Sequence, residues 1–195
     1  MDAGFAELIF FAYIPLWASF GDWFAQLWAE SLGKEGKGSQ PIPAVGVTDQ
    51  HSVNQMFLDG PRNKACLFLT CPGLPDGPRF PKDLPDKFDY VRGKDFGELI
   101  RAEGLGTMMA LQKNDVPLVE LRLGADSPKL AGKMIALLGA ATILTGWLMD
   151  INPLDQPAVE LGKRLAKARL GADGLGPEKE DLDAFLSARR EIREF

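Results

Sequence analysis

Apolar residues gather along the chain in short runs that are typical of buried strands. The runs ELIFFAY (residues 7–13) and KACLFLTC (64–71) have the length and composition of strands covered on both faces of a parallel sheet. VPLVELRL (116–123) is also expected to form a strand. A shorter strand is expected in AVGVTDQ (44–50), which ends in a polar turn. The pattern therefore predicts four strands spread over the first two thirds of the chain.

Between these runs the apolar residues recur at helical spacing. The helices expected from this spacing cover residues 16–32, 94–113, 127–150 and 155–170, with one more within 178–192. Pro15 can open the first helix and Gly33 can end it, because proline suits the first turn and glycine suits a C-cap. The helix at 127–150 is apolar over most of its surface, which predicts burial in a core or a subunit interface.

A short helix is expected after residue 52, with Asp49 or Ser52 as its N-cap. Its apolar residues should share one face: Val53, Met56 and Phe57. Glycine and proline predict loops at residues 32–43 and 72–89. Strands that alternate with helices imply right-handed βαβ crossovers. The fold class is therefore α/β, a three-layer α/β/α sandwich with a parallel sheet over residues 1–170, followed by a charged tail at 171–195 that can be helical.

Composition and charge exclude several classes of protein. The formal net charge is -5 with no basic stripe, so nucleic acid is not an expected partner. Asp2 and Glu7 stand where a secretory signal carries basic residues, and Pro15 interrupts the apolar run, so no membrane segment is expected there. Cys66 and Cys71, with one histidine in the chain, do not make a zinc site. Buried reduced thiols and a cytoplasmic protein are expected instead.

Glu30 is the first candidate for chemistry, because a carboxylate in the last turn of a helix faces the negative end of the helix dipole. Trp28 and Leu27 can also lower its solvation. Both effects favour the protonated form, so Glu30 could exchange a proton near neutral pH. The alternative is a solvated surface glutamate.

His51 is the second candidate, in TDQHS near an expected helix start. The helix dipole there favours the neutral ring, which could exchange protons at neutral pH. The alternative is a hydrogen-bonded structural histidine.

A third candidate group lies in DQPAVELGK, where Asp155 can cap a helix and Gln156 then lies at an anion-binding helix start. Lys163 follows two turns along the same face, with Glu160 between them. The alternative is a capped helix with a Glu160–Lys163 surface pair.

Three segments together resemble a known family. QLWAESLGK, GVTDQHS and INPLDQPAVELGK follow the order and spacing of the C-terminal part of phosphoglucose isomerase, also called glucose-6-phosphate isomerase. FGDWFAQLWAESLGK is similar to the bacterial motif nearly residue for residue. The resemblance runs from about residue 17 to residue 167 and is weak through the proline-rich loop. It implies a C-terminal sugar isomerase (SIS) domain.

The resemblance also implies an activity, the reversible aldose–ketose isomerisation of glucose 6-phosphate and fructose 6-phosphate through a cis-enediol, in glycolysis and gluconeogenesis. Glu30 would carry the proton between C2 and C1 of the opened sugar. His51, helped by Lys163, would open the ring, and Gln156 would bind the sugar phosphate. No metal and no organic cofactor is expected. The family's histidine typically reaches its site from the neighbouring subunit, which implies a homodimer.

Two departures limit the resemblance. The usual FDQxGVE reads LDQPAVE, with Leu154 and Ala158 at positions that look like packing. The phosphate loop and the glycine–glycine–arginine segment of the family's earlier half are absent from this sequence. The missing N-terminal isomerase domain is therefore an expected partner, and the chain alone should be inactive. The alternative function is a non-catalytic sugar-phosphate-binding or dimerisation module.

Overall fold

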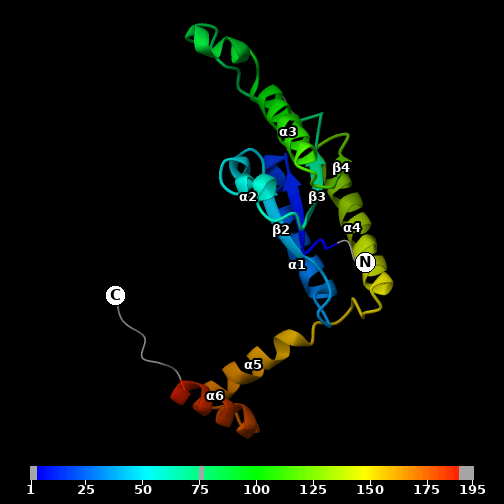
Figure 1. Ribbon diagram of the computed structural model, residues 1–195, viewed down its shortest axis with the longest axis vertical. Helices are drawn as coiled ribbons and strands as arrows, with labels where there is room; N and C mark the ends of the chain where they lie inside the picture. Colours follow the sequence, from blue (N-terminus) through cyan, green and yellow to red (C-terminus); the bar gives the residue numbers. More distant parts are fainter. Residues whose placement is uncertain (1–3, 75–76, 189–195) are drawn as a thin grey trace. The chain divides into compact units, whose positions relative to one another are not determined.

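The computed structural model describes residues 4–74 and 77–188 (Figure 1). Four parallel strands form one sheet in the order β2-β1-β3-β4. Their bounds are β1 (Glu7–Ala12), β2 (Gln40–Val45), β3 (Lys64–Thr70) and β4 (Leu118–Arg122). The two central strands, β1 and β3, are the most continuously apolar, because both of their faces are covered.

The connections between strands contain helices, as the periodicity predicted. The α-helices are α1 (Ala18–Leu32), α2 (Asn54–Asp59), α3 (Phe96–Lys113), α4 (Pro128–Leu148), α5 (Ala158–Arg169) and α6 (Gly176–Ala188). Short 3-10 helices occur at η1 (Pro15–Trp17), η2 (Thr48–Gln50) and η3 (Asp86–Val91). Pro15 opens η1, and α1 follows directly. Residues 189–192 of the last expected helix lie outside the described residues.

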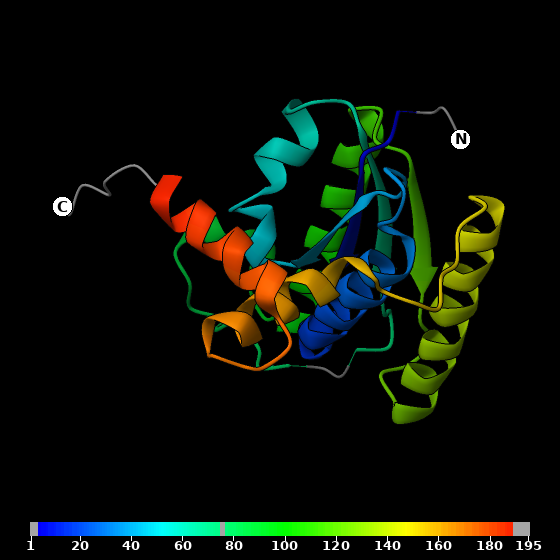
Figure 2. The ribbon, with the colours of Figure 1, turned by 90° about the horizontal axis from the view of Figure 1, so that it is seen from below.

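The sheet separates two hydrophobic cores. Phe10 and Ala12 of β1 point into one core, which α1 and α4 cover. Ile9 and Phe11 point into the other, which α2 and α3 cover. Figure 2 shows these helices on the two sides of the strands. The predicted fold class, a three-layer sandwich with a parallel sheet, is therefore confirmed. Alternating side chains of a strand face opposite layers, so a single apolar run supplies both cores.

The loop predicted at residues 32–43 is wrong in its last third. Residues 40–45 form β2, in which Pro41 lies opposite Leu8 and Pro43 lies opposite Phe10. Proline cannot donate a ladder hydrogen bond, so it is confined to edge strands or bulges. β2 is an edge strand that pairs with β1 alone, which is why it tolerates both prolines.

The short helix α2 differs from its prediction in two ways. Neither Asp49 nor Ser52 caps it, because the Asp49 carboxylate accepts hydrogen bonds from the Val45 N–H (2.7 Å) and the Ser52 hydroxyl (2.9 Å). Phe57 is buried, but Val53 and Met56 are 39% and 59% exposed. With only six residues, α2 inserts one aromatic side chain into the core, so the expected apolar face is wrong.

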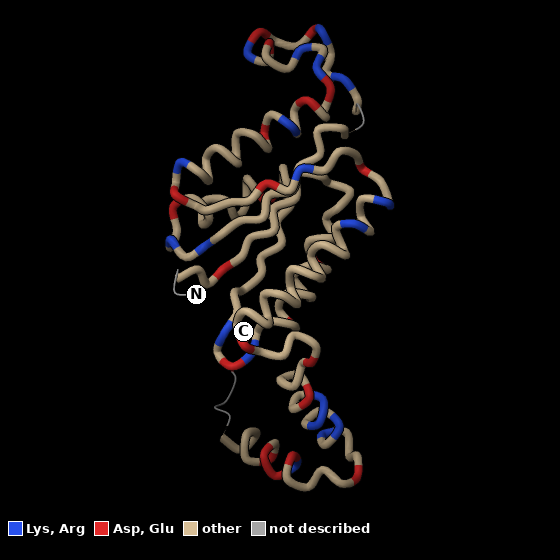
Figure 3. Tube along the Cα trace, turned by 90° about the vertical axis from the view of Figure 1, so that its right-hand side faces the viewer, with Lys and Arg blue, Asp and Glu red and all other residues tan. Residues whose placement is uncertain are grey.

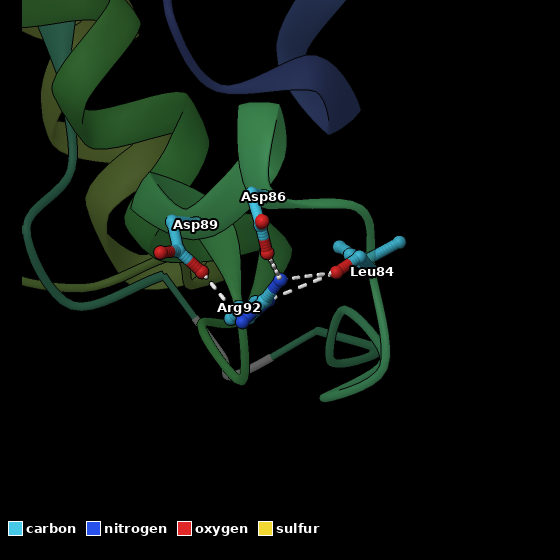
Figure 4. Close-up of polar contacts among 4 residues, drawn as sticks. All are labelled: Leu84, Asp86, Asp89 and Arg92. Atoms are coloured by element: carbon cyan, nitrogen blue, oxygen red, sulfur yellow. Dashed lines mark hydrogen bonds and ion pairs between the residues drawn. The ribbon is translucent and has the colours of Figure 1, made fainter.

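The proline-rich segment is irregular up to Pro85 among its described residues, and it then forms the 3-10 helix η3. Arg92 holds this turn together (Figure 4). Its guanidinium donates to the Leu84 carbonyl and pairs with Asp86 at 3.0 Å and Asp89 at 2.7 Å. The expectation of a loop through residue 89 is therefore wrong from Asp86 onward. One arginine therefore links the start and the end of this turn by hydrogen bonds and ion pairs.

Helix α4 is the long apolar helix expected from the sequence, with Ser127 as its N-cap. One stripe of it is buried: Met134, Leu138, Thr142 and Gly146. Leu144, Trp147 and Leu148 are 54%, 63% and 78% exposed. Figure 3 shows that α4 carries no charge after its first turns. By length and composition it could cross a membrane, but a single such helix is weak evidence and does not indicate a membrane protein.

The described chain divides into two compact units, Met1–Leu154 and Asp155–Phe195. The first contains the sheet. In the second, α5 and α6 pack together through Ala168, and Arg164 pairs with the buried carboxylate of Glu178. The sequence instead grouped α5 with the sheet and set the boundary at residue 170, which stays a prediction about folding domains.

Candidate active site

Glu30 lies in the last turn of α1, as predicted, and its side chain is half-buried. Its carboxylate accepts a hydrogen bond of 3.1 Å from the side-chain amide of Gln26, one turn earlier. Trp28 does not shield it. That indole packs against Phe24 at 5.5 Å and donates to Ser39 at 3.1 Å, so it faces the core side of the helix. A polar neighbour on the same helix face therefore contacts the candidate base.

The end of α1 lies at the amino edge of the sheet, because α1 runs back against the direction of β1 and β2. The Gln40 N–H, at the start of β2, donates to the Ala6 carbonyl just before β1. Two lysines after Glu30 connect this edge to the segment after α4. Lys34 donates to the Asn152 carbonyl, and Lys37 donates to the Met149 carbonyl at 3.0 Å.

These two lysines were not singled out in the sequence, although GKEGK directly follows the glutamate segment. Their ammonium groups bind backbone carbonyls at and just after the C-terminus of α4. This terminus is the negative end of the helix dipole. They place two ammonium groups at the amino edge of the sheet, where Lys37 also pairs with Glu35 at 3.3 Å.

His51 lies at the carboxyl edge of the sheet, directly after η2. Its ring is exposed, and Nε2 lies 3.3 Å from the side-chain nitrogen of Gln50. Asp49 fixes the turn by accepting the Val45 N–H at the end of β2. His51 precedes α2 by three residues, so it is close to a helix start, as predicted.

A buried network that the sequence did not reveal supports this turn. The Tyr13 hydroxyl lies 2.5 Å from Oε1 of Gln50 and 2.7 Å from the Thr107 hydroxyl. The Gln50 amide nitrogen donates to Glu103 of α3. Burial raises the pKa of Tyr13 to about 12, against a smaller opposing effect of the Thr107 hydrogen bond. Tyr13 directly follows β1, Gln50 ends η2, and the other two residues lie in α3. The only local signal was the glutamine next to the histidine.

Glu30 and His51 are consequently at opposite edges of the sheet in one copy of the chain. The six residues of β2 separate the two edges, and at about 3.3 Å per residue this strand spans about 20 Å. Within one copy, therefore, the structure does not bring the two residues together.

In the second unit, the structure corrects the start of α5. The helix begins at Ala158 with Pro157 as N-cap and no side-chain cap, so Asp155 is not the cap. Pro157 lacks an N–H and has a φ of -65°, which allows the helix to start after it. Gln156 is exposed and precedes the helix, so it does not share a helical face with Lys163.

Lys163 forms the expected surface pair with Glu160. Its Nζ lies 2.7 Å from Glu160 Oε1, and both side chains are 60% exposed. The hydrogen bond and the charge of Lys163 lower the pKa of Glu160. The lysine is therefore accessible and charged, and it is held by a contact that exchanges with water at small cost.

No group of three or more histidine, cysteine or acidic residues within residues 4–74 and 77–188 could hold a metal ion. Cys66 and Cys71 are free and buried, as predicted. Burial raises the pKa of Cys66 to about 12, so the thiol stays protonated and inert.

No family model matches the chain. It is 36% identical over 198 residues to a probable glucose-6-phosphate isomerase of Haloarcula marismortui, with 98% of the chain and 43% of that protein covered. It is 42% identical over 154 residues to the glucose-6-phosphate isomerase of Rubrobacter xylanophilus, with 78% and 36% covered. Identity to a probable glucose-6-phosphate isomerase of Methanococcus maripaludis is 39% over 157 residues, with 79% and 34% covered.

Two solved structures share the fold of this chain. A hypothetical protein from Thermus thermophilus matches with a TM-score of 0.81 at 32% identity, covering 86% of this chain and 42% of that one. A glucose-6-phosphate isomerase from Chlamydia trachomatis matches with a TM-score of 0.71 at 21% identity, covering 95% and 39%. The second likeness shows the fold alone.

The parallel sheet between two helical layers defines a three-layer α/β/α protein. The chain belongs to the glucose-6-phosphate isomerase family, and it spans about two fifths of the length of the relatives that it matches.

Proposed function

We propose that this chain is the part of a glucose-6-phosphate isomerase that carries the proton-transfer and ring-opening groups. The reaction is the reversible conversion of glucose 6-phosphate to fructose 6-phosphate, an intramolecular oxidoreduction in glycolysis and gluconeogenesis. The observation that carries this proposal is the similarity to isomerases over 78% to 98% of the chain, with Glu30, His51, Gln156 and Lys163 all present.

Glu30 acts as the base. Moving hydrogen from C2 to C1 through a planar cis-enediol needs one carboxylate on one face of the intermediate, which accepts the proton and returns it. The location of Glu30 at a helix C-terminus supports this role, because the helix dipole opposes a fixed negative charge there. Lys34 and Lys37 supply positive charge at the same edge for the enediolate.

His51 and Lys163 open the sugar ring, and Gln156 binds the sugar phosphate. Both His51 and Lys163 are exposed, so a ligand can reach them. Lys163 must exchange Glu160 for substrate, and an exposed ion pair of this kind contributes little to stability. The pair therefore does not block the proposed role.

The active enzyme is a homodimer in which His51 of one copy serves Glu30 of the other. The separation of the two residues by the length of β2 supports this, because an acid–base group has to lie within hydrogen-bonding distance of the atoms it serves. The exposed apolar face of α4 supplies a surface for burial in the assembled enzyme.

The chain alone does not turn over substrate. The phosphate loop and the arginine segment expected for the family belong to the N-terminal isomerase domain, the second partner of this chain. The assembled enzyme works in the cytoplasm without metal or organic cofactor. A non-catalytic assembly module is the second candidate, favoured by the exposed face of α4.

The test of this proposal replaces the base in the full-length isomerase. Glu30→Gln should reduce isomerisation and C2 proton exchange by at least about 10²- to 10⁴-fold, the usual contribution of a general base. Binding of a sugar-phosphate inhibitor should remain. Asp22→Asn, an exposed change about two turns earlier on the same helix, is the matched control and should leave turnover unchanged. Unchanged turnover in Glu30→Gln would remove this residue from the mechanism and favour the assembly module.

A further inference from the structure

The side-chain amide of Gln50 has one orientation that its neighbours allow. Its nitrogen faces the Glu103 carboxylate, which can only accept hydrogen bonds. Its oxygen faces the hydroxyls of Tyr13 (2.5 Å) and Thr107 (3.2 Å). Turning the amide over would place its oxygen against the Glu103 carboxylate. The carboxylate therefore fixes the NH₂ group on the side that also faces His51.

One N–H of this NH₂ group bonds Glu103, and the other is left for the imidazole. The Gln50 nitrogen lies 3.3 Å from Nε2 of His51. Since the amide nitrogen donates, Nε2 must accept, and the single proton of the neutral ring is then on Nδ1. Within residues 4–74 and 77–188, no other side chain bonds the ring.

We propose that Gln50 is a positioning residue that fixes the Nδ1–H tautomer and the orientation of the His51 ring, with Glu103, Tyr13 and Thr107 holding its amide. An exposed histidine would otherwise sample several rotamers and both tautomers. Here the Glu103 carboxylate and the hydroxyls of Tyr13 and Thr107 hold the Gln50 amide. The amide in turn holds the His51 ring.

The support beneath Gln50 is rigid. Tyr13 is 2% exposed and stacks on Phe68 with ring centroids 5.0 Å apart. Glycines flank its ring on two sides. A Cβ at Gly46 would lie 2.5 Å from the ring atoms, and one at Gly104 would lie 3.0 Å away. The hydroxyl of Tyr13 is therefore held in place by packing, and it locates the Gln50 oxygen.

The benefit for catalysis rests on the function proposed above. With Nε2 engaged by Gln50, Nδ1–H is the group that His51 presents to a ligand, and it can donate a hydrogen bond to the ring oxygen of a sugar. The Nε2–H tautomer of His51 would place its proton against the N–H of the Gln50 amide. The tautomer itself is a property of this chain and does not depend on what the chain binds.

Nitrogen-15 NMR of the 195-residue chain tests the proposal directly, because the chain contains one histidine. At a pH where the ring is neutral, the long-range proton–nitrogen spectrum should show a protonated Nδ1 and an unprotonated Nε2. A protonated Nε2 in the wild-type chain would overturn the proposal, whether or not any variant folds.

The double variant Gln50→Glu/Glu103→Gln exchanges the two groups while keeping the net charge and their mutual hydrogen bond. The group facing His51 then accepts, so the ring should change to a protonated Nε2. Gln55→Glu is the control, an exposed glutamine four residues from His51, and should leave the tautomer unchanged. An unchanged tautomer in a folded double variant would refute the positioning role.

The two proposals fail separately. A protonated Nε2 in the wild type refutes the positioning role and leaves the Glu30 chemistry intact. Full turnover of the Glu30→Gln enzyme refutes the function and leaves the tautomer of His51 as measured.

Discussion

Glu30 and His51 lie at opposite edges of one parallel sheet, with the six residues of β2 between their edges. At about 3.3 Å per residue, this strand spans about 20 Å between the two edges. A proton donor and a base that act on one sugar must both reach it, which a single copy cannot arrange with these two residues. The proposed mechanism therefore requires Glu30 of one subunit and His51 of the other at each site, and this requirement can be tested.

Mixed dimers should recover the activity that each mutant lacks. In the full-length isomerase, Glu30→Gln and His51→Ala dimers should each be inactive. After subunit exchange, a hybrid dimer has one site with both an intact Glu30 and an intact His51. An equal mixture should therefore regain about a quarter of wild-type activity, because half of the dimers are hybrids with one working site. Activity that stays at the level of the parents would place both residues in one subunit's site.

His51→Ala should separate ring opening from isomerisation. The variant should slow turnover of the cyclic substrate by about 10²-fold or more, the size of an acid–base contribution. Turnover of the open-chain form should change far less, since that form needs no ring opening. Stopped-flow assays on both forms measure the ratio. Equal losses on the two substrates would contradict the ring-opening role.

Gly146→Ala should destabilise the amino edge of the sheet. A Cβ there would lie 2.7 Å from Cβ of Pro153 and 3.3 Å from the side chain of Leu32, two residues after Glu30. Overpacking of this kind costs about 1–3 kcal/mol of the free energy of unfolding. Gly139→Ala is the matched control on the same helix, because its Cβ meets nothing within 4 Å. It should gain up to about 1 kcal/mol from helix propensity.

Chemical denaturation followed by tryptophan fluorescence compares the two glycine variants. Losses of equal size in both would show that the contact of Gly146 with Pro153 is unimportant.

Tyr13 should ionise only near pH 12 in the folded chain. Burial raises the pKa of Tyr13 from 10.0 to about 12, so the neutral form is favoured in the folded state. This contribution to stability is complete below pH 10 and is lost as the pH rises from 10 toward 12, because the unfolded chain releases the proton first. Absorbance titration of a Tyr90→Phe variant, which leaves Tyr13 as the sole tyrosine, measures it. Ionisation near pH 10 while the chain is still folded would contradict the buried network.

The local pattern of residues in the sequence predicted most of the strands and helices and the positions of the candidate residues. The apolar runs located β1, β3 and β4, the 3.6-residue spacing located α1, α3 and α4, and three motifs located Glu30, His51 and Lys163. These features depend on neighbours within a few residues, so the sequence alone contains them. The prolines of β2 misled the prediction, because their tolerance depends on the strand lying at a sheet edge.

Only the tertiary structure decided what surrounds the candidate residues. Tyr13, Gln50 and Thr107 are far apart in the sequence and meet because β1, η2 and α3 converge at one edge of the sheet. The placement of Glu30 at the other edge follows from the direction of α1 against the strands. Long-range contacts of this kind depend on how the layers pack, and no local pattern of residues encodes which side chains the packing brings together.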